Sequence, residues 1–571
     1  MIKIKKFLIL IPSFFIFAQS ESIISYEMKM ANGKGNSGNF FENIFDVNTF
    51  FDNDLYLFTQ FEYSVPPLLG STSNGIDEIL NMIYAQYSND NYDLTIGNLY
   101  LLQGMGLSLH TFQNQDIDYD NSINGIDINY HLNDRFDIFS SIGYSNVKSR
   151  SNPVESEPSI SIKNNVGIFG TRFFHDNFEL HYLTMAYNQL YDSSDLLSID
   201  NSGSISEIDG VTSGTEIGIY LDEFTEYIIS ENPDYEMNNL EHNIGLSFMI
   251  GPVDFYLEKS LVYYNKLLSE RTDGYKNYMS IYANLLGFDV LYEYKDYSTT
   301  LLYNVFSNPP IVFKEASSAL IGRNLHTVDF SNEYGHQIDI NRIFHNDLTL
   351  LISYAFALHY REGYEDKNIF NFNIYDDVSL LNDLFPYEQY FIEFSNWSKN
   401  EKFYYRIGND YYYEVISEKE KIEAKTIPMQ YAYKFKGGNS LTIYAELQDK
   451  YVEKLDYLYD HDFIYLSPSY NHFGKWSLTF FSDIETYTYA LNPFSENYLG
   501  LVEENEDTPD PNLGKPLDNN KYAVDFTVNI DNSQLSLFFG SQKGGLVCAN
   551  GSCVLQPDFE DGLKVTFRTS F

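Results

Sequence analysis

The stretch FYYRIGNDYYYEV, residues 403–415, alternates between two kinds of side chain. A period of two places these two sets on opposite faces of an extended strand. One face is apolar or aromatic except at Asn409, and the other carries most of the polar groups. The apolar face holds Phe403, Tyr405, Ile407, Tyr411, Tyr413 and Val415, and the other holds Tyr404, Arg406, Gly408, Asp410, Tyr412 and Glu414.

The same alternation recurs from one end of the chain to the other. It is clear in residues 441–448 and 522–530, and it already begins at residues 24–30. The segments run to about ten residues, against about five to six for an ordinary strand and about nine to eleven for a tilted strand that crosses a bilayer. Tyr (50) and Phe (45) are abundant and favour strands. The sequence predicts one all-β unit without a domain boundary.

The connections between the predicted strands alternate between short and long, which is typical of an outer-membrane β-barrel. We expect a single antiparallel transmembrane barrel over residues 21–571, with about 24 strands in a range of roughly 20 to 26. Short periplasmic turns are expected at 52–54, 133–134, 175–177, 251–252, 344–347, 436–439, 472–474 and 531–532. Long extracellular loops are expected at 64–78, 147–162, 190–238, 304–325, 362–385, 416–424, 452–459 and 490–519.

Both ends of the chain fit this interpretation. Residues 1–20 combine a lysine cluster, an apolar stretch and a small-residue cleavage site, and predict a secretory signal peptide. The last strand, GLKVTFRTSF at 562–571, is amphipathic and ends in Phe. It resembles the signal that barrel-insertion machinery recognises. We therefore expect the outer membrane of a Gram-negative bacterium, with both termini on the periplasmic side because the strand number is even.

A family resemblance rests on residues 93–130 and on the closing hairpin of residues 544–571. These segments resemble an uncharacterised Bacteroidota-type family of outer-membrane barrels. Gln103 stands where the family pattern often has Phe. The resemblance implies a single barrel without a plug domain and brings no catalytic residues or cofactor. The motif residues are Gly97, Tyr100, Gly104, Gly106, Asn121 and Gly125.

The charge balance limits the possible functions. Asp and Glu number 80 against 36 Lys and Arg, giving a formal charge of −44, which excludes nucleic-acid binding because phosphate contacts need a basic surface. A barrel of this size leaves a wide lumen unless loops such as 190–238 fold in. We expect a porin-like channel for small polar solutes, with a preference for cations. The candidate lumen-lining residues are Arg406, Asp410, Glu414, Glu446 and Asp525.

A second hypothesis remains open beside the channel. The barrel could be occluded and its acidic outer loops could bind a partner protein, a surface polymer or Ca²⁺. An energy-coupled transporter fits poorly, because its plug needs roughly 100 residues before the barrel and the alternation starts at Ile24. An enzyme is not expected, since no G-x-S-x-G nucleophile elbow is present.

Asp116, Asp118 and Asp120 resemble the start of a calcium loop, with Asp127 at its last position. Asn121 replaces the glycine that such a loop needs, and the final ligand is Asp rather than a bidentate Glu. We favour a solvated outer loop and expect no metal.

The two cysteines, Cys548 and Cys553, could form a metal site, a redox pair or a structural staple. Two thiols are too few for a zinc site, and the C-x-x-C redox spacing is absent. Asn550-Gly551 favours a two-residue hairpin turn, in which Ala549 faces Ser552 and Cys548 faces Cys553. We expect a disulfide on an exposed hairpin in the last outer loop, residues 542–559.

Overall fold

In the computed structural model of this 571-residue protein, the wall of a barrel and parts of its interior are described. Residues 1–19 of the expected signal peptide and residues 193–233 of the expected constricting loop lie outside the described residues. The described residues are 20–34, 39–52, 54–66, 80–149, 160–192, 234–264, 273–299, 305–314, 318–324, 326, 328, 332–345, 347–360, 384–417, 420–493, 495, 510–549, 552–556 and 558–571.

Among the described residues, 25 strands form one antiparallel sheet, of which β26 (Leu517–Asp518) pairs only with part of β25. The other 24 form the barrel wall, as the sequence predicts. The first half of the wall is β1 (Ser20–Lys34), β2 (Asn39–Phe51), β3 (Leu55–Val65), β4 (Leu80–Ser88), β5 (Tyr92–Leu99), β10 (Ile123–Asn133), β11 (Phe136–Ser149), β12 (Ile160–His175), β13 (Phe178–Asp192), β14 (Asp234–Ile250), β15 (Val253–Tyr264) and β16 (Asp273–Leu285). The second half is β17 (Phe288–Ser298), β18 (Asn332–Ile343), β19 (Thr349–Tyr360), β20 (Leu384–Trp397), β21 (Phe403–Ser417), β22 (Glu420–Lys434), β23 (Ser440–Glu453), β24 (Tyr457–His472), β25 (Trp476–Leu491), β27 (Lys521–Ile530), β28 (Ser533–Gln542) and β31 (Phe559–Ser570).

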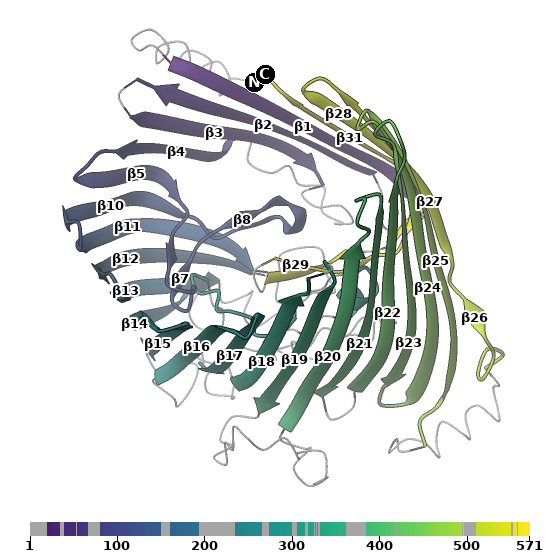
Figure 1. The fold of residues 1–571 in the computed structure, drawn as a ribbon. Helices are drawn as coiled ribbons and strands as arrows, with labels where there is room; N and C mark the ends of the chain where they lie inside the picture. The colour runs from purple at the N-terminus through teal and green to yellow at the C-terminus, as the bar shows by residue number, and fades with distance from the viewer. Residues whose placement is uncertain are drawn as a thin grey trace.

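The last strand closes the ring against the first. β31 pairs with β28 on one side and with β1 on the other, where Met28 faces Phe567 (Figure 1). Closure leaves each of the 24 described wall strands paired on both sides. An unpaired edge in a sheet this rich in aromatic residues would be exposed to aggregation.

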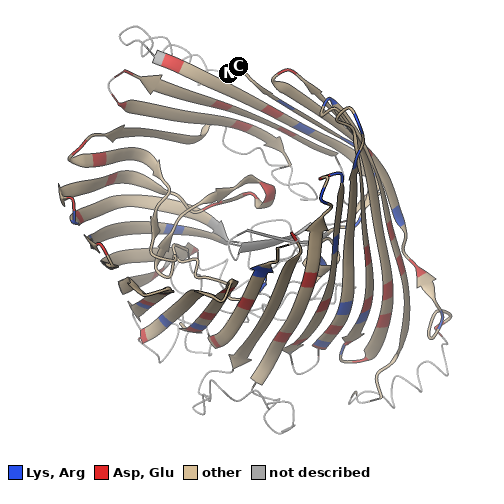
Figure 2. Cartoon of the chain, viewed as in Figure 1, with Lys and Arg blue, Asp and Glu red and all other residues tan. Residues whose placement is uncertain are grey.

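Burial along the strands separates an outer face from an inner face. In β21, Tyr405 and Ile407 are exposed on the outside while Asp410, Tyr412 and Glu414 are buried on the inside. The alternation read from residues 403–415 therefore has its apolar face outward. Exposed aliphatic and aromatic side chains recur around the outer wall, whereas acidic residues are distributed over many wall strands and turns (Figure 2).

The connections are short at one end of the barrel, and each expected short turn is confirmed. β1 begins and β31 ends at this short-turn end, since Ser20 pairs with Phe51 and Thr569 with Ser533. Two expected long loops, 416–424 and 452–459, are wrong. β21 and β22 pair as far as Ser417 and Glu420, and only residues 454–456 lie between β23 and β24.

Three segments leave the wall strands and carry their own short elements. The first inner segment, residues 100–122, contains β6 (Leu102–Gln103), β7 (Leu109–His110), β8 (Gln113–Asn114), the 3-10 turn η2 (Gln115–Ile117) and β9 (Tyr119–Asp120). The second inner segment, residues 305–328, contains the 3-10 turn η3 (Ile321–Arg323). The C-terminal hairpin consists of β29 (Gly545–Ala549) and β30 (Ser552–Gln556).

The first inner segment crosses the lumen. Near its start, Arg172 of β12 donates hydrogen bonds to the Gln103 side chain. Further along, Gln115 donates to Glu62 of β3 at 2.8 Å. β12 and β3 lie in different parts of the ring (Figure 1). Glu62 and Gln103 are both buried, so the segment runs through the interior between these two strands. The expectation of a solvated outer loop here is wrong, since this polar stretch finds buried partners on the inner wall.

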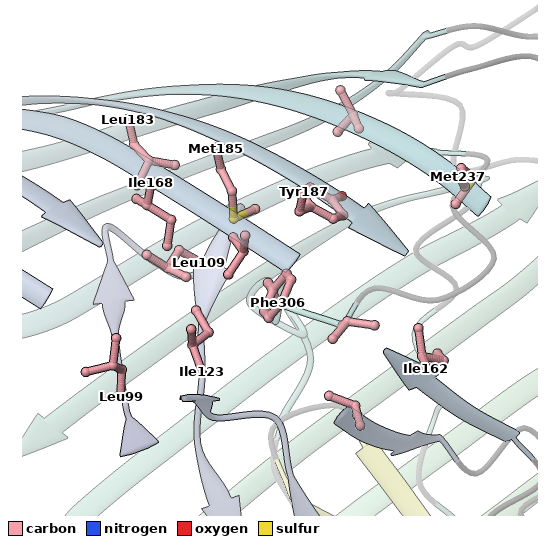
Figure 3. Packing of buried hydrophobic residues seen from close by; sticks show 14 of the residues in the cluster. Leu99, Leu109, Ile123, Ile162, Ile168, Leu183, Met185, Tyr187, Met237 and Phe306 are labelled. Atoms are coloured by element: carbon pink, nitrogen blue, oxygen red, sulfur yellow. The ribbon is translucent and has the colours of Figure 1, made fainter. Parts of the chain in front are cut away.

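A large apolar cluster holds the inner segments against the wall. Figure 3 shows Leu109 and Phe306 of the two inner segments with Leu183, Met185 and Tyr187 of β13. Apolar residues on the inner face of a membrane barrel need such a cover, because an aqueous lumen would leave them in water.

A second cluster lies under the second inner segment. Phe313 packs there with inward side chains of β19 to β23, among them Tyr387 and Tyr412. No helix among the described residues is long and apolar enough to cross a membrane.

Candidate functional site in the barrel lumen

The first inner segment leaves and rejoins the wall at a single paired position, Leu99 opposite Ile123. Just inside, Gly104 has a φ of +58°, in the left-handed region that favours glycine. A Cβ there would lie 2.5 Å from Oε2 of Glu258. That carboxylate oxygen instead accepts a hydrogen bond from the Met105 backbone N–H at 2.7 Å. The glycine lets a buried wall carboxylate bind the backbone directly.

Two further motif residues close the segment on itself. The Tyr100 hydroxyl donates to Asp120 at 3.2 Å. The buried Asn121 amide accepts from the Phe112 N–H at 2.6 Å and donates to the carbonyls of His110 and Val305. Three of the six residues singled out in the sequence, Tyr100, Gly104 and Asn121, therefore build this inward fold.

The two inner segments are bonded to each other across a large separation in sequence. The backbone N–H of His110 donates to the Phe306 carbonyl at 2.7 Å. The Asn308 N–H donates to the Gly106 carbonyl at 2.9 Å. Together with the bond from Asn121 to Val305, at 2.7 Å, these contacts make the two segments one body.

Glu446 of β23 anchors the second inner segment to the wall. Its carboxylate, fully buried, accepts hydrogen bonds from the Ser318 hydroxyl at 2.7 Å and from the N–H groups of Ala319 and Leu320 at 2.8 and 2.9 Å. A carboxylate at the start of a 3-10 turn satisfies donors that the turn leaves without partners. Arg323, within η3, pairs with Asp483 of β25.

Past η3, His326 lies between two carboxylates. Its Nδ1 is 2.6 Å from Glu414 of β21 and its Nε2 is 3.2 Å from Glu333 of β18. The ring also stacks on Tyr387, with centroids 4.3 Å apart. Burial opposes a charge on His326, but the two carboxylates outweigh it and raise the pKa of His326 to about 9. The histidine is a cation that ties the segment to two wall strands.

The C-terminal hairpin also turns inward, which corrects the expectation of an exposed outer tip. β29 contacts both η2 and η3, and Lys543 next to it pairs with Glu485 of β25. The expected register is confirmed, with Ala549 opposite Ser552 and Cys548 opposite Cys553. That register suits a disulfide, which stays a prediction.

A polar pocket of about 760 Å³ remains beside the inner segments. Its walls come from β1, β2, β3, β31 and the β27–β28 turn, and its cover is the stretch Gln113–Asp116. It extends from the short-turn end, at Asp531, to Lys29 partway along β1. Lys29 lies 3.0 Å from Glu42 and 3.6 Å from Glu27. None of its lining residues belongs to either large apolar cluster.

The five candidate lumen-lining residues all lie on the inner face of wall strands. Most of them contact other residues of the protein instead of an open lumen. Asp410 accepts from Gln389, and Glu414 and Glu446 hold the second inner segment. Arg406 lies 3.7 Å from Glu393 and over the Tyr444 ring. Asp525 accepts from Thr527 and Ser536. Their main role in this fold is to hold the interior together.

The calcium-loop candidates do not converge. Asp120 is occupied by Tyr100 and by Ser122, Asp116 lies 3.8 Å from Lys29, and Asp118 adopts a left-handed backbone conformation after η2. Over the described part of the chain, no group of three His, Cys, Asp or Glu side chains could hold a metal ion.

Sequence reasoning missed the buried ion pairs of the lumen. Lys276 pairs with Glu241 at 3.0 Å, and Lys295 pairs with Glu333, all four side chains being almost fully buried. Each pair joins residues of different strands, so no spacing of residues along the sequence predicts the pairs. The only sequence signal was a basic residue on the inward face of an otherwise acidic barrel.

A family of unknown function (DUF6029) matches residues 13–153, which include the motif and the first inner segment. No curated protein matches the chain.

Solved structures give a distant likeness. The copper transporter OprC has 8% identity and a TM-score of 0.43 over 97% of this chain and 81% of its own. The siderophore receptor PirA from Pseudomonas aeruginosa has 6% identity and a TM-score of 0.43 over 97% and 81%. The P pilus usher (PapC) translocation pore has 8% identity and a TM-score of 0.39 over 96% and 99%.

Proposed function

We propose that the protein is an outer-membrane channel whose lumen is narrowed by its own inner segments and which passes small polar or cationic solutes. The proposal includes short turns and both termini on the periplasmic side, no separate plug domain, and an origin in a Bacteroidota-type family. The apolar outer wall of the closed ring supports a membrane location, since every backbone group of a closed barrel is paired.

The observation that carries the channel is the polar pocket along β1, β2, β3 and β31. It begins at the short-turn end and follows a part of the inner wall that neither large apolar cluster covers. Four carboxylates and two basic groups line it: Glu27, Asp46, Asp116 and Asp531 against Lys29 and Arg568. An excess of acidic groups in a narrow path favours cations.

The test is a reversal-potential measurement in planar bilayers, with a salt gradient and neutral osmolytes of increasing size. The channel is expected to prefer cations and to be blocked by osmolytes well below the size that an unfilled 24-strand ring would admit. Anion preference, or no current from protein that is folded in the bilayer, would contradict it.

A second candidate, the occluded platform, is favoured by a different observation. Two apolar clusters and two buried ion pairs hold the inner segments against the wall, which a simple diffusion pore does not need. Absence of current from the folded protein, combined with retained order of the inner segments, would support this candidate.

A further inference from the structure

We propose that the polar pocket is a binding site for small organic cations that carry both ammonium and hydroxyl groups, such as short amino-sugar chains. This deepens the channel function and rests on it for its role in transport. The pocket volume of about 760 Å³ lies within the roughly 300 to 1,000 Å³ typical of small-molecule sites.

The positive charges of the pocket are already neutralised within the wall. Lys29 lies 3.0 Å from Glu42 and 3.8 Å from Asp116. Arg568 pairs with Glu27 at 2.9 Å. A bound anion would have to compete with these carboxylates, so the pocket disfavours anions.

Two other carboxylates of the pocket, Asp46 and Asp531, do not form ion pairs within the described part of the chain. Asp46 accepts hydrogen bonds from the neutral groups of Ser25, at 3.2 Å, and Gln60, at 2.9 Å. Asp531 lies exposed in the β27–β28 turn. Neither has a basic side chain at ion-pair distance within the described part of the chain. They offer a cation two attractive contacts within the same pocket.

The rest of the lining fits hydroxyl groups. Ile44 is the only aliphatic lining residue, and most of the others are amides and hydroxyls. The amides of Gln113, Asn532 and Gln534 each offer both donors and an acceptor. A sugar hydroxyl is also both donor and acceptor, so an amide-rich wall can replace its water shell.

The experiment measures binding of three disaccharides to the full-length protein in detergent, by titration calorimetry at low salt and about pH 6, where carboxylates are ionised and amines are charged. The probes are the glucosamine disaccharide (cationic), its N,N′-diacetyl form (neutral) and digalacturonate (anionic). The cationic probe is expected to bind at least tenfold more tightly than the neutral one, and digalacturonate not at all.

The substitutions Asp46→Asn and Asp531→Asn are each expected to weaken cation binding roughly fivefold. Asp347→Asn is the matched control, because Asp347 is an exposed turn aspartate at the same end with a positive φ, as at Asp531, but lies outside the pocket. Equal binding of the neutral probe, no binding of the cationic probe, or an equal loss in the control overturns the assignment.

Failure of the two proposals can be told apart. A barrel that binds the amine but carries no current refutes the channel and leaves the pocket assignment intact. A conducting, cation-preferring barrel that does not bind the amine refutes this assignment alone.

Discussion

Leu99 and Ile123 face each other across the β5–β10 ladder, and both side chains are completely buried. All of the first inner segment lies between these two partners in the chain. The wall is therefore continuous beside the segment, and the segment is an insertion that the lumen accommodates. The closure of the barrel wall and the filling of its lumen can therefore be tested separately.

Asn121 joins the two inner segments, so Asn121→Ala should loosen both. Loss of a buried amide that bonds three backbone groups costs about 1 to 3 kcal/mol or more. We expect faster proteolysis within residues 100–122 while the wall keeps its resistance to unfolding in detergent. The control is Asn165→Ala, which removes an exposed asparagine from β12. Equal proteolysis of the variant and the native protein would show that the amide does not hold the segments.

Glu446→Ala should release the start of the second inner segment, because three donors lose their acceptor. We expect a larger unitary conductance, with Glu446→Gln intermediate since an amide oxygen still accepts. Glu423→Ala, on the opposite face of neighbouring β22, is the control and should leave conductance unchanged. An unchanged conductance in Glu446→Ala would argue that this segment does not narrow the path.

His326 should make stability depend on pH in the alkaline range. Its folded-state pKa of about 9 exceeds the unfolded value of about 6.5. The stabilisation is thus complete below about pH 6.5 and is lost as the pH rises through about 9. Thermal unfolding between pH 6.5 and 9.5 should show a declining midpoint that is flatter in His326→Gln. Parallel pH profiles for the two proteins would exclude this role for the histidine.

Cys548 and Cys553 should form an intramolecular disulfide in protein isolated from an oxidising compartment. Alkylation before and after reduction, followed by intact mass measurement, should show two reactive thiols only after reduction. The small loop limits the gain in stability to about 2 kcal/mol. Two thiols that react without prior reduction would contradict the disulfide.

The wall could be predicted from the sequence because its rule is local. The alternation of Asp410, Tyr412 and Glu414 with outward residues such as Ile407 is visible within one strand, and the short turns at 251–252 and 531–532 carry their own turn residues. The long loop expected at residues 416–424 was wrong because the polar residues there belong to two strands that a tight hairpin joins.

The filling of the lumen could not be predicted, because its contacts join residues far apart in the chain. Nothing near Glu446 shows that it binds residues 318–320, and nothing near Gln115 points to Glu62. A polar segment is predicted to be a solvated loop when the buried polar residues that it binds lie far away in the sequence. The glycine spacing at Gly104 and Gly106 was a signal of an unusual backbone. Its meaning depends on residues far away in the chain, Glu258 beside Gly104 and the Asn308 carbonyl beside Gly106.

The central claim is that the inner segments narrow a barrel that can exist without them. Replacing residues 100–122 by Asn-Gly should join Leu99 to Ile123 through a two-residue hairpin turn and keep the wall closed. The most direct measurement is the unitary conductance of this variant beside the native protein, with folding of both verified by heat-modifiable electrophoretic mobility. We predict a several-fold larger conductance in the variant and a small, cation-preferring conductance in the native protein. Equal conductances from two folded barrels would contradict the claim.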